Sequence, residues 1–242
     1  MFNALVVNKD DEEFTAEIKQ LEESDLPEGD VLIDVEYSTI NYKDGLAVTN
    51  SSPIVRNWPM VPGIDLAGTV AESSNPEVTV GEKVLINGWG IGEETFGGFS
   101  QRARVQGAWT IPVPKNFTTA QTMAIGTAGY TSMLSVLALE EHGITPEAGP
   151  ILVTGASGGV GSIAIALLST RGYEVHASTG RTEEADYLTS LGASTIIDRQ
   201  ELSEQSKRPL MSTRWAGAID AVGSHTLANV LAAIEPFGCV AA

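Results

Sequence analysis

The stretch Ile151-Leu152-Val153-Thr154-Gly155-Ala156-Ser157-Gly158-Gly159-Val160-Gly161 joins a short apolar run to a segment rich in Ala, Ile and Leu. The run 151–154 has the composition of a buried strand, and residues 160–171 have that of a helix. Glycines let the backbone between them turn sharply, and a helix N-terminus offers free N–H groups and a positive dipole end. The pattern predicts a loop that binds a phosphate group, with a plain tight turn as the alternative.

The segments around this loop alternate between strand and helix. Further strands are expected at residues 174–178, 194–198, 216–222 and 239–242, and further helices at residues 127–139, 183–191 and 226–235. Strands separated by helices predict a doubly wound parallel sheet. Before Gly126 the chain is β-rich instead. Short β-branched runs lie between turn residues there, at 31–37, 68–71 and 83–86, and predict a small barrel or sandwich.

The end of the strand after the loop indicates which dinucleotide is bound. Proteins that bind NAD commonly place Asp or Glu about 20 residues after the glycine loop, where it holds the ribose 2′-hydroxyl. Here residues 177–181 are Ala-Ser-Thr-Gly-Arg, with hydroxyls and an arginine but no acid. The guanidinium of Arg181 suits a 2′-phosphate, so NADPH is expected. The alternative is that Arg181 only begins the next helix on its solvated face.

Residues 155–159 also match G-x-S-x-G, the nucleophile elbow of α/β-hydrolases. Ser157 would then be the nucleophile, with Asp198 or Asp220 and His225 following in the order of a triad. That scheme gives no role to Gly161 or to the 178–181 cluster, so it is the weaker hypothesis. A short-chain reductase is disfavoured because no Tyr-x-x-x-Lys follows the loop.

The composition excludes several kinds of site and partner. The chain of 242 residues has 31 acidic and 14 basic residues, a formal net charge of −17, which disfavours nucleic acid and anionic membranes as partners. Cys239 is the single cysteine, so a disulfide framework and a thiolate zinc cluster are excluded. No basic n-region precedes the first apolar run, and no apolar stretch is expected to reach the roughly 18 residues of a membrane span. A cytoplasmic protein is predicted.

Further motifs lie along the chain at residues 26–30 (LPEGD), 41–47 (NYKDGLA), 62–70 (PGIDLAGTV), 87–90 (NGWG), 97–98 (GG), 126–131 (GTAGYT), 154–161 (TGASGGVG) and 215–220 (WAGAID). In these stretches, and in collinear order over nearly its whole length, the chain resembles the medium-chain dehydrogenase/reductase superfamily, specifically its zinc-free acrylyl-CoA reductase/quinone oxidoreductase branch.

The resemblance implies an α/β fold made of a GroES-like β-rich catalytic domain and a Rossmann doubly wound parallel sheet. Residues 1–125 are expected to form the catalytic domain, which is incomplete, and residues 126–242 the NADPH-binding domain, truncated after its fifth strand. The C-terminal part that returns to the catalytic domain is expected to be missing. The full-length protein is expected to be a homodimer.

The resemblance also bears on zinc. Zinc alcohol dehydrogenases of this superfamily hold their catalytic metal with an early Cys and a Gly-His-Glu motif. The corresponding positions here are Asn41 and Gly63-Ile64-Asp65, which lack thiolate and imidazole. No metal site is therefore predicted.

The implied reaction is hydride transfer from NADPH to the β-carbon of a short 2-enoyl thioester such as acrylyl-CoA. Tyr42 would line the nicotinamide site and hold the substrate or relay the proton, and Asn41 would hydrogen-bond the substrate or cofactor. The remaining cofactor contacts are expected from Ser157, Gly158, Gly159 and Val160 to the pyrophosphate, and from Ser178, Thr179, Gly180, Arg181 and Arg199 to the 2′-phosphate.

Alternatives remain at this stage. The protein could be an NADPH:quinone oxidoreductase or a non-catalytic NADPH-binding protein, and Tyr42 could be a buried core tyrosine. A local ion pair is expected between Lys43 and Asp44.

Overall fold

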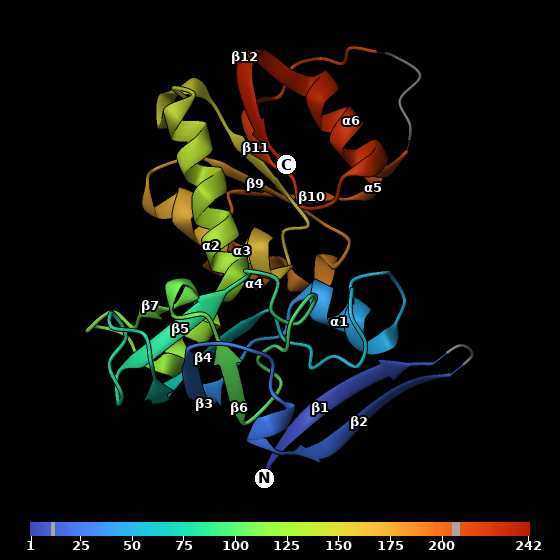
Figure 1. Ribbon diagram of the computed structural model, residues 1–242. Helices are drawn as coiled ribbons and strands as arrows, with labels where there is room; N and C mark the ends of the chain where they lie inside the picture. Colours follow the sequence, from blue (N-terminus) through green and yellow to red (C-terminus); the bar gives the residue numbers. More distant parts are fainter. Residues whose placement is uncertain (11–12, 205–208) are drawn as a thin grey trace. The chain divides into compact units, whose positions relative to one another are not determined.

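The computed structural model describes residues 1–10, 13–204 and 209–242, which form two compact units, Met1–Thr127 and Ala128–Ala242. The boundary expected from the sequence lay two residues earlier. Figure 1 shows the elements of both units, coloured along the sequence from blue at the N-terminus to red at the C-terminus.

Unit 1 is built on antiparallel strands. Its sheet has five, in the order β6-β3-β4-β5-β7. Their bounds are β3 Val31–Tyr37, β4 Asp65–Ser73, β5 Lys83–Asn87, β6 Arg102–Val105 and β7 Ile111–Pro112. Apolar side chains from four of these strands, such as Ile33, Leu66 and Ile86, form a buried core. The expected β-rich character of this half is confirmed, and the run 31–37 was predicted with its correct bounds.

Several features of unit 1 were not predicted, among them the strands β6 and β7. Strands β1 (Phe2–Lys9) and β2 (Phe14–Leu21) pair as an antiparallel hairpin, and α1 (Tyr42–Thr49) is a two-turn helix. Along β1 the side chains of Phe2, Ala4 and Val6 alternate inward with period 2, which was a readable strand signal. Short 3-10 helices lie at η1 (Glu23–Asp25) and η2 (Gly107–Trp109).

Unit 2 is a five-stranded parallel sheet in the order β10-β9-β8-β11-β12. Its strands are β8 Ile151–Thr154, β9 Val175–Thr179, β10 Thr195–Asp198, β11 Trp215–Ile219 and β12 Ile234–Ala241. Its helices are the C-terminal part of α2 (Thr119–Glu141), then α3 Gly159–Thr170, α4 Ala185–Ser190, α5 Gln200–Ser203 and α6 Ser224–Ala233, with 3-10 turns η3 (Pro146–Ala148) and η4 (Thr182–Glu184). The doubly wound parallel sheet is confirmed.

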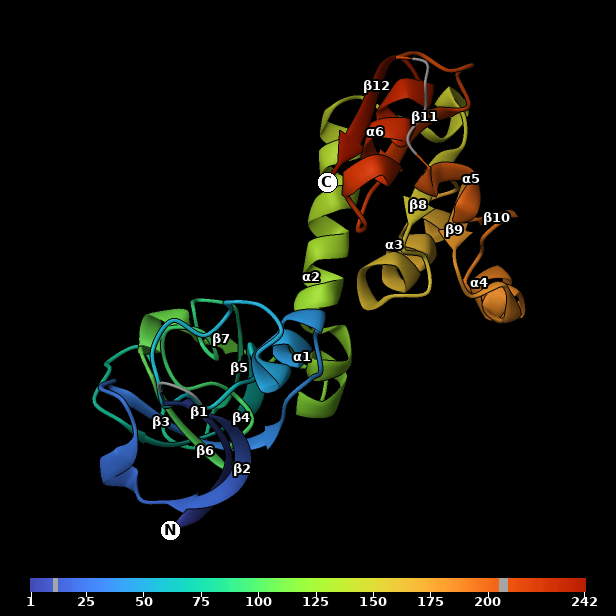
Figure 2. The ribbon, with the colours of Figure 1, turned by 90° about the vertical axis from the view of Figure 1, so that its right-hand side faces the viewer.

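Helices cover both faces of this sheet because the strand side chains alternate. Ile151 and Val153 pack on the face covered by α2, α3 and α4. Leu152 points the other way, into a cluster with residues of α5 and α6. These helices are visible in Figures 1 and 2. A strand buried on both faces has the continuous apolar sequence seen at residues 151–153.

Helix α2 consists of two helical segments that meet at Gly126, where φ is 51° and ψ is −163°. The second segment begins at Thr127, as predicted, whereas the first, from Thr119, was not predicted. By length and composition α2 could cross a membrane, which was not expected from the sequence. Its residues Met123, Val136 and Leu139 lie in buried clusters, and a core helix passes the same test.

The last strand was predicted too short. The sequence placed it at residues 239–242, whereas β12 starts at Ile234. The first half of β12 was missed because it is irregular. Its pairing with β11 shifts register, and Phe237 has φ 68°.

Candidate functional site

The glycine loop lies between β8 and α3, as predicted. Gly155 has φ 59°, a left-handed conformation that favours glycine. A Cβ on Gly161 would lie 2.5 Å from the carbonyl oxygen of Gly155, so only glycine allows α3 to approach the loop this closely. The first-turn N–H groups of α3, on residues 159–161, have no partner within the helix by its geometry. The loop therefore presents backbone donors and a helix N-terminus, as an anionic phosphate requires.

A hydroxyl pair holds the loop against the next strand. Ser157 Oγ lies 2.6 Å from Thr179 Oγ1, and Thr179 Oγ1 also accepts the N–H of Arg181 at 3.0 Å. The backbone N–H of Ala156 donates to the Ser178 carbonyl at 3.1 Å. These contacts bring the two predicted cofactor segments, 157–160 and 178–181, side by side.

Arg199 joins this cluster across the sheet. Its backbone N–H donates to the Thr179 carbonyl at 2.9 Å, and its side chain lies against Gly180. A Cβ on Gly180 would lie 2.6 Å from both Cδ and Nε of Arg199, so the glycine makes room for the arginine. Arg181 is more solvated: 65% of its side chain is exposed, and its guanidinium lies 3.5 Å from Glu184.

A buried carboxylate organises the centre of the same sheet edge. Asp220 accepts from the Thr154 hydroxyl at 2.6 Å and from the Gly223 N–H at 2.7 Å. Strands β8 and β11, which carry Thr154 and lead to Asp220, are neighbours where the strand order reverses. In open parallel sheets ligands bind outside the carboxyl ends of the strands at such a point.

The predicted residues of unit 1 lie at the start of α1. Asn41 is the N-cap, and Tyr42, the first helical residue, is 85% exposed. The alternative that Tyr42 is a buried core tyrosine is therefore wrong. The Asn41 amide donates to Asp65 at 2.8 Å and to Asp44 at 3.2 Å.

The ion pair expected between Lys43 and Asp44 is wrong. Lys43 Nζ instead contacts Glu93 Oε1 at 2.9 Å. Asp44 is buried and accepts from the backbone N–H groups of Asn41 at 2.8 Å and Ile64 at 3.0 Å. Burial raises the pKa of the Asp44 carboxyl above its usual value; these hydrogen bonds oppose that shift, and the nearby charge of Asp65 adds to it.

Asp65, at one of the positions that correspond to the zinc site of related dehydrogenases, holds several elements of unit 1. Its buried carboxylate accepts from Asn41, Asn87 and Thr127. Asn87 lies opposite Asp65 in the pairing of β4 with β5. Asn87 and Thr127 were missed as parts of the site because they lie far from Asp65 in sequence. The motifs 87–90 and 126–131 were the only sequence signals for them.

The residues at the zinc positions do not fit the metal. Asn41 and Ile64 offer neither thiolate nor imidazole, and Asp65 is committed to hydrogen-bond donors. Within the described ranges, no group of three or more His, Cys, Asp or Glu side chains is placed to hold a metal ion.

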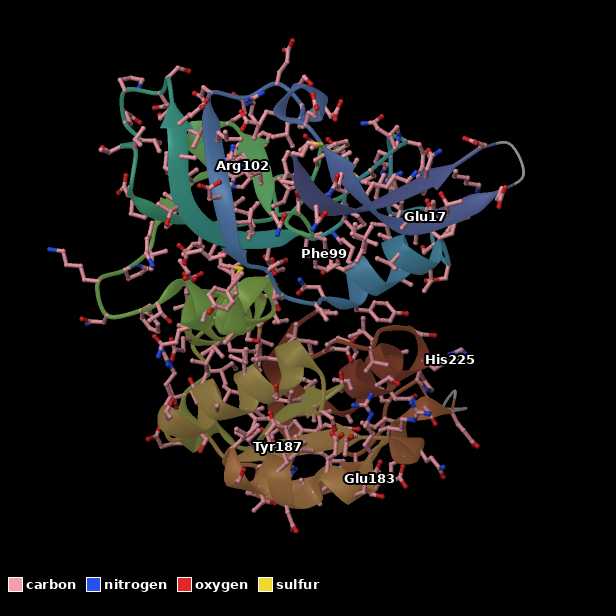
Figure 3. The ribbon with its side chains drawn as sticks, turned by 90° about the horizontal axis from the view of Figure 1, so that it is seen from below. Glu17, Phe99, Arg102, Glu183, Tyr187 and His225 are labelled. Atoms are coloured by element: carbon pink, nitrogen blue, oxygen red, sulfur yellow. The ribbon has the colours of Figure 1, made fainter. Side chains whose placement is uncertain are left out.

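The hydrolase arrangement is also not assembled in the part of the chain that the structure describes. The Ser157 hydroxyl bonds to Thr179, and Asp220 bonds to Thr154 and Gly223. Asp198 accepts the N–H of Gln200 at 2.9 Å. His225, labelled in Figure 3, is exposed at the start of α6. A triad needs the serine bonded to a histidine, which is not what these contacts provide.

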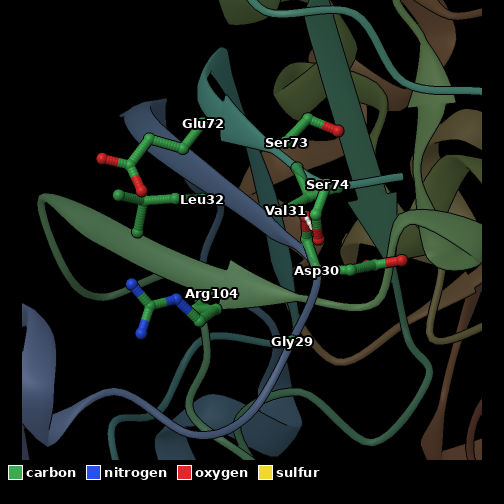
Figure 4. Close-up of a pocket in the computed structure, with 8 residues that line it drawn as sticks. All are labelled: Gly29, Asp30, Val31, Leu32, Glu72, Ser73, Ser74 and Arg104. Atoms are coloured by element: carbon green, nitrogen blue, oxygen red, sulfur yellow. Dashed lines mark hydrogen bonds between the residues drawn. The ribbon is translucent and has the colours of Figure 1, made fainter. Parts of the chain in front are cut away.

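Two surface hollows of unit 1 lie apart from these residues. One of about 340 Å³ is lined by residues of β3, β4 and β6, with Asp30 and Arg104 as charged residues of opposite sign in its lining (Figure 4). Another of about 480 Å³ is lined by residues of β1 and β2 and by residues 35–38 and 98–101. Neither is lined by Asn41, Tyr42 or Asp65.

Comparison with known proteins identifies the family. Residues 27–115 match the family described as alcohol dehydrogenase GroES-like domain, and residues 159–242 match the one described as zinc-binding dehydrogenase. The chain is 55% identical to the acrylyl-CoA reductase AcuI of Ruegeria pomeroyi, over 100% of this chain and 74% of that protein. The chain belongs to the medium-chain dehydrogenase/reductase superfamily.

Two other members of the superfamily are informative about ligands. The yhdH oxidoreductase of Salmonella enterica, crystallised in complex with NADP, has a TM-score of 0.95 and 50% identity over 98% of this chain and 73% of its own. The putative quinone oxidoreductase YhfP of Bacillus subtilis is 45% identical over 100% of this chain and 73% of its own. Its crystal structure has NAD bound. The chain thus spans about three quarters of the length of these oxidoreductases.

Proposed function

We propose that this protein uses NADPH to reduce the carbon–carbon double bond of a short 2-enoyl thioester such as acrylyl-CoA, without zinc. In that reaction a hydride passes from NADPH to the β-carbon, a proton is added at the α-carbon, and the double bond becomes single. The observation that carries the cofactor half of the proposal is the packing of Arg199 over Gly180, beside a glycine loop and with no acid at the end of β9. The substrate half is supported by the identity to the Ruegeria pomeroyi acrylyl-CoA reductase.

The nucleotide-binding segments fit NADPH on their own chemistry. The exposed backbone of Gly158 and Gly159 leaves room for a pyrophosphate at the start of α3, and Ser157 and Val160 complete this cradle. Arg199 and Arg181 supply positive charge for the 2′-phosphate. Ser178 and Thr179 are buried, so their part is to shape the strand end on which Gly180 sits.

NADPH, when bound, supplies the hydride, and the protein's residues bind and orient the cofactor and the substrate. Tyr42 has an exposed ring and hydroxyl, which suit contact with the nicotinamide or substrate and relay of the proton. Both amide hydrogens of Asn41 point at carboxylates, so its part is to fix the start of α1 as well as to meet a ligand.

A quinone is the second candidate acceptor, because the Bacillus subtilis relative is named a putative quinone oxidoreductase. A conjugated quinone also takes hydride without a metal. We further propose a cytoplasmic location and a homodimer for the full-length form, with neither nucleic acid nor membrane as a partner, in keeping with the net charge of −17.

The test is NADPH oxidation followed by absorbance, with acrylyl-CoA and a benzoquinone offered separately and NADH as the control cofactor. It is run on the 242-residue chain and on the same chain extended by the part of the Ruegeria pomeroyi relative that it does not span. NADPH-specific turnover of acrylyl-CoA is expected. If only the benzoquinone is turned over, a quinone and not an enoyl thioester is the substrate. NADPH binding without any turnover in either form would leave a non-catalytic binding protein.

A further inference from the structure

Asp65 lies at the start of β4, fully buried, and its carboxylate collects donors from three separate segments of unit 1. Oδ1 accepts from the Asn87 amide at 2.7 Å and from the Thr127 hydroxyl at 2.5 Å. Oδ2 accepts from the Asn41 amide at 2.8 Å and from the Thr127 backbone N–H at 3.0 Å. Each oxygen therefore takes two hydrogen bonds.

This pattern is specific to a carboxylate. The two oxygens of an aspartate offer about four acceptor positions, and all four are used. The partners are two amide nitrogens, a backbone N–H and a hydroxyl, and none of them is a cation. An asparagine at this position would turn an NH₂ group toward at least one of these donors and leave it unpaired, which is costly in a buried place.

Each of the three tethers fixes a feature next to it. Asn41 is the N-cap of α1, so its bond sets the position of Tyr42, the next residue. Asn87 ends β5 and leads into a turn in which Trp89 adopts φ 59° and remains 62% exposed. Thr127 resumes helix α2 after Gly126, where a Cβ would lie 3.1 Å from Asp65 Oδ2.

We propose that Asp65 is a positioning residue for catalysis, one that acts by holding Asn41, and through it Tyr42, in place. This inference rests on the proposed function for Tyr42. Because reacting groups must be held to within a fraction of an ångström, loosening the start of α1 slows the chemical step more than it weakens binding.

The experiment compares Asp65→Asn with a matched control, Asp30→Asn. Asp30 is also a carboxylate of unit 1 that holds other segments: it accepts from the Gly107 N–H at 2.6 Å and from Asn75 at 2.8 Å. These partners are distinct from Asn41, Asn87 and Thr127, so the loss of the Asp30 carboxylate reports the purely structural effect. Thr127→Val, which keeps the side-chain shape and replaces the hydroxyl by a methyl group, is the milder second variant.

In the extended form of the chain, Asp65→Asn is expected to lower kcat by about 10- to 100-fold while KM for NADPH changes by less than about threefold. Asp30→Asn is expected to lower Tm with kcat within about twofold of the parent. Thr127→Val is expected to lower kcat by a few-fold and to add nothing further in the Asp65→Asn background, because both act through the same carboxylate. Should Asp65→Asn fail to fold, the kcat of Thr127→Val alone decides: a value equal to the parent's overturns the proposal.

Hydrogen exchange separates this proposal from the proposed function. Amides of residues 42–49 are expected to exchange faster in Asp65→Asn, or in Thr127→Val, than in the parent and in Asp30→Asn, whether or not the protein turns over acrylyl-CoA. If the parent is inactive with every acceptor but hydrogen exchange at α1 rises in the variants, the proposed function is wrong, whereas the inference that Asp65 holds the start of α1 in place is supported. If hydrogen exchange at α1 is the same in the variants as in the parent, Asp65 does not position this helix. If kcat per folded molecule is the same, Asp65 does not position it for catalysis.

Discussion

The side chain of Arg199 occupies the space that any side chain on residue 180 would need: a Cβ there would be 2.6 Å from Cδ and Nε of the arginine. The two residues belong to successive β-α connections, and the backbone N–H of Arg199 bonds to Thr179, directly before the glycine. This close approach places a cation at the end of β9, where proteins that use NAD commonly carry an acid.

Replacing that cation should change cofactor preference. Arg199→Ala is expected to raise KM for NADPH by about 10- to 100-fold, the loss of one charge-assisted contact, with little effect on KM for NADH. Steady-state kinetics with both cofactors check this. Arg171→Ala is the control, because Arg171 lies in the same unit and pairs with Glu140 at the surface. An equal rise for both cofactors would contradict a contact to the 2′-phosphate.

Gly180→Ala should act in the same direction without unfolding the protein. The atoms it meets belong to the flexible arginine side chain, which can move away. We expect KM for NADPH to rise several-fold and Tm to change by less than about 3 °C. Cofactor titration and thermal melts are the measurements. An unchanged preference for NADPH would show that the position of the Arg199 side chain is unimportant.

Gly161→Ala should be far more disruptive, because the new methyl would meet backbone rather than a movable side chain. Its nearest atoms would be the Gly155 oxygen at 2.5 Å and the Ala156 Cα at 2.7 Å. We expect a loss of about 1–3 kcal/mol in the free energy of unfolding together with lost NADP binding. Gly45→Ala, a helical glycine with nothing within 4 Å of the new Cβ, should instead gain about 0.5–1 kcal/mol. Urea unfolding and NADP titration are the measurements for both variants. If Gly161→Ala and Gly45→Ala lost the same free energy of unfolding, the close contact in the loop would be refuted.

Glu36 should contribute a pH-dependent part of the stability of unit 1. The hydroxyls of Thr119 and Thr69, and then Lys83, hold the pKa of its carboxyl below its ordinary 4.5. A depressed folded pKa means that the stabilisation is complete above the unfolded value and is lost as the pH falls from there through the folded one. Glu36→Gln should therefore cost about 1 kcal/mol near neutral pH and progressively less below about pH 4.

Thermal melts of the parent and Glu36→Gln between neutral and acidic pH measure this difference. Glu72→Gln, at an exposed carboxylate on β4, is the control. A gap between parent and Glu36→Gln that stays constant on acidification would argue against a depressed pKa.

The sequence predicted those parts of the fold whose signal is local. The glycine loop, the apolar run at Ile151–Thr154 and the alternation of strand and helix are written in neighbouring residues, and the parallel sheet follows from them. The helix predicted from Thr127 does begin there, because Gly126 has non-helical φ and ψ and separates it from an earlier helical segment that starts at Thr119 and was not predicted.

The contacts of the site that join distant residues were beyond the sequence. Lys43 and Asp44 are adjacent, so an ion pair was the natural expectation, yet the lysine meets Glu93 and the aspartate turns inward to Ile64. Likewise nothing local indicates that Asp65 bonds to Thr127, 62 residues away. Such pairs form only when the strands bring them together, and composition and periodicity carry no record of that.

The four hydrogen bonds at Asp65 have a consequence for how this protein can change over generations. Because the carboxylate has no acceptor position to spare, Asn41, Asn87, Thr127 and Asp65 cannot drift one at a time without leaving a donor or an acceptor unpaired. Lineages should therefore keep this quartet or replace several of its members in concert. Substitution should stay rare at these positions even where the surrounding surface diverges freely.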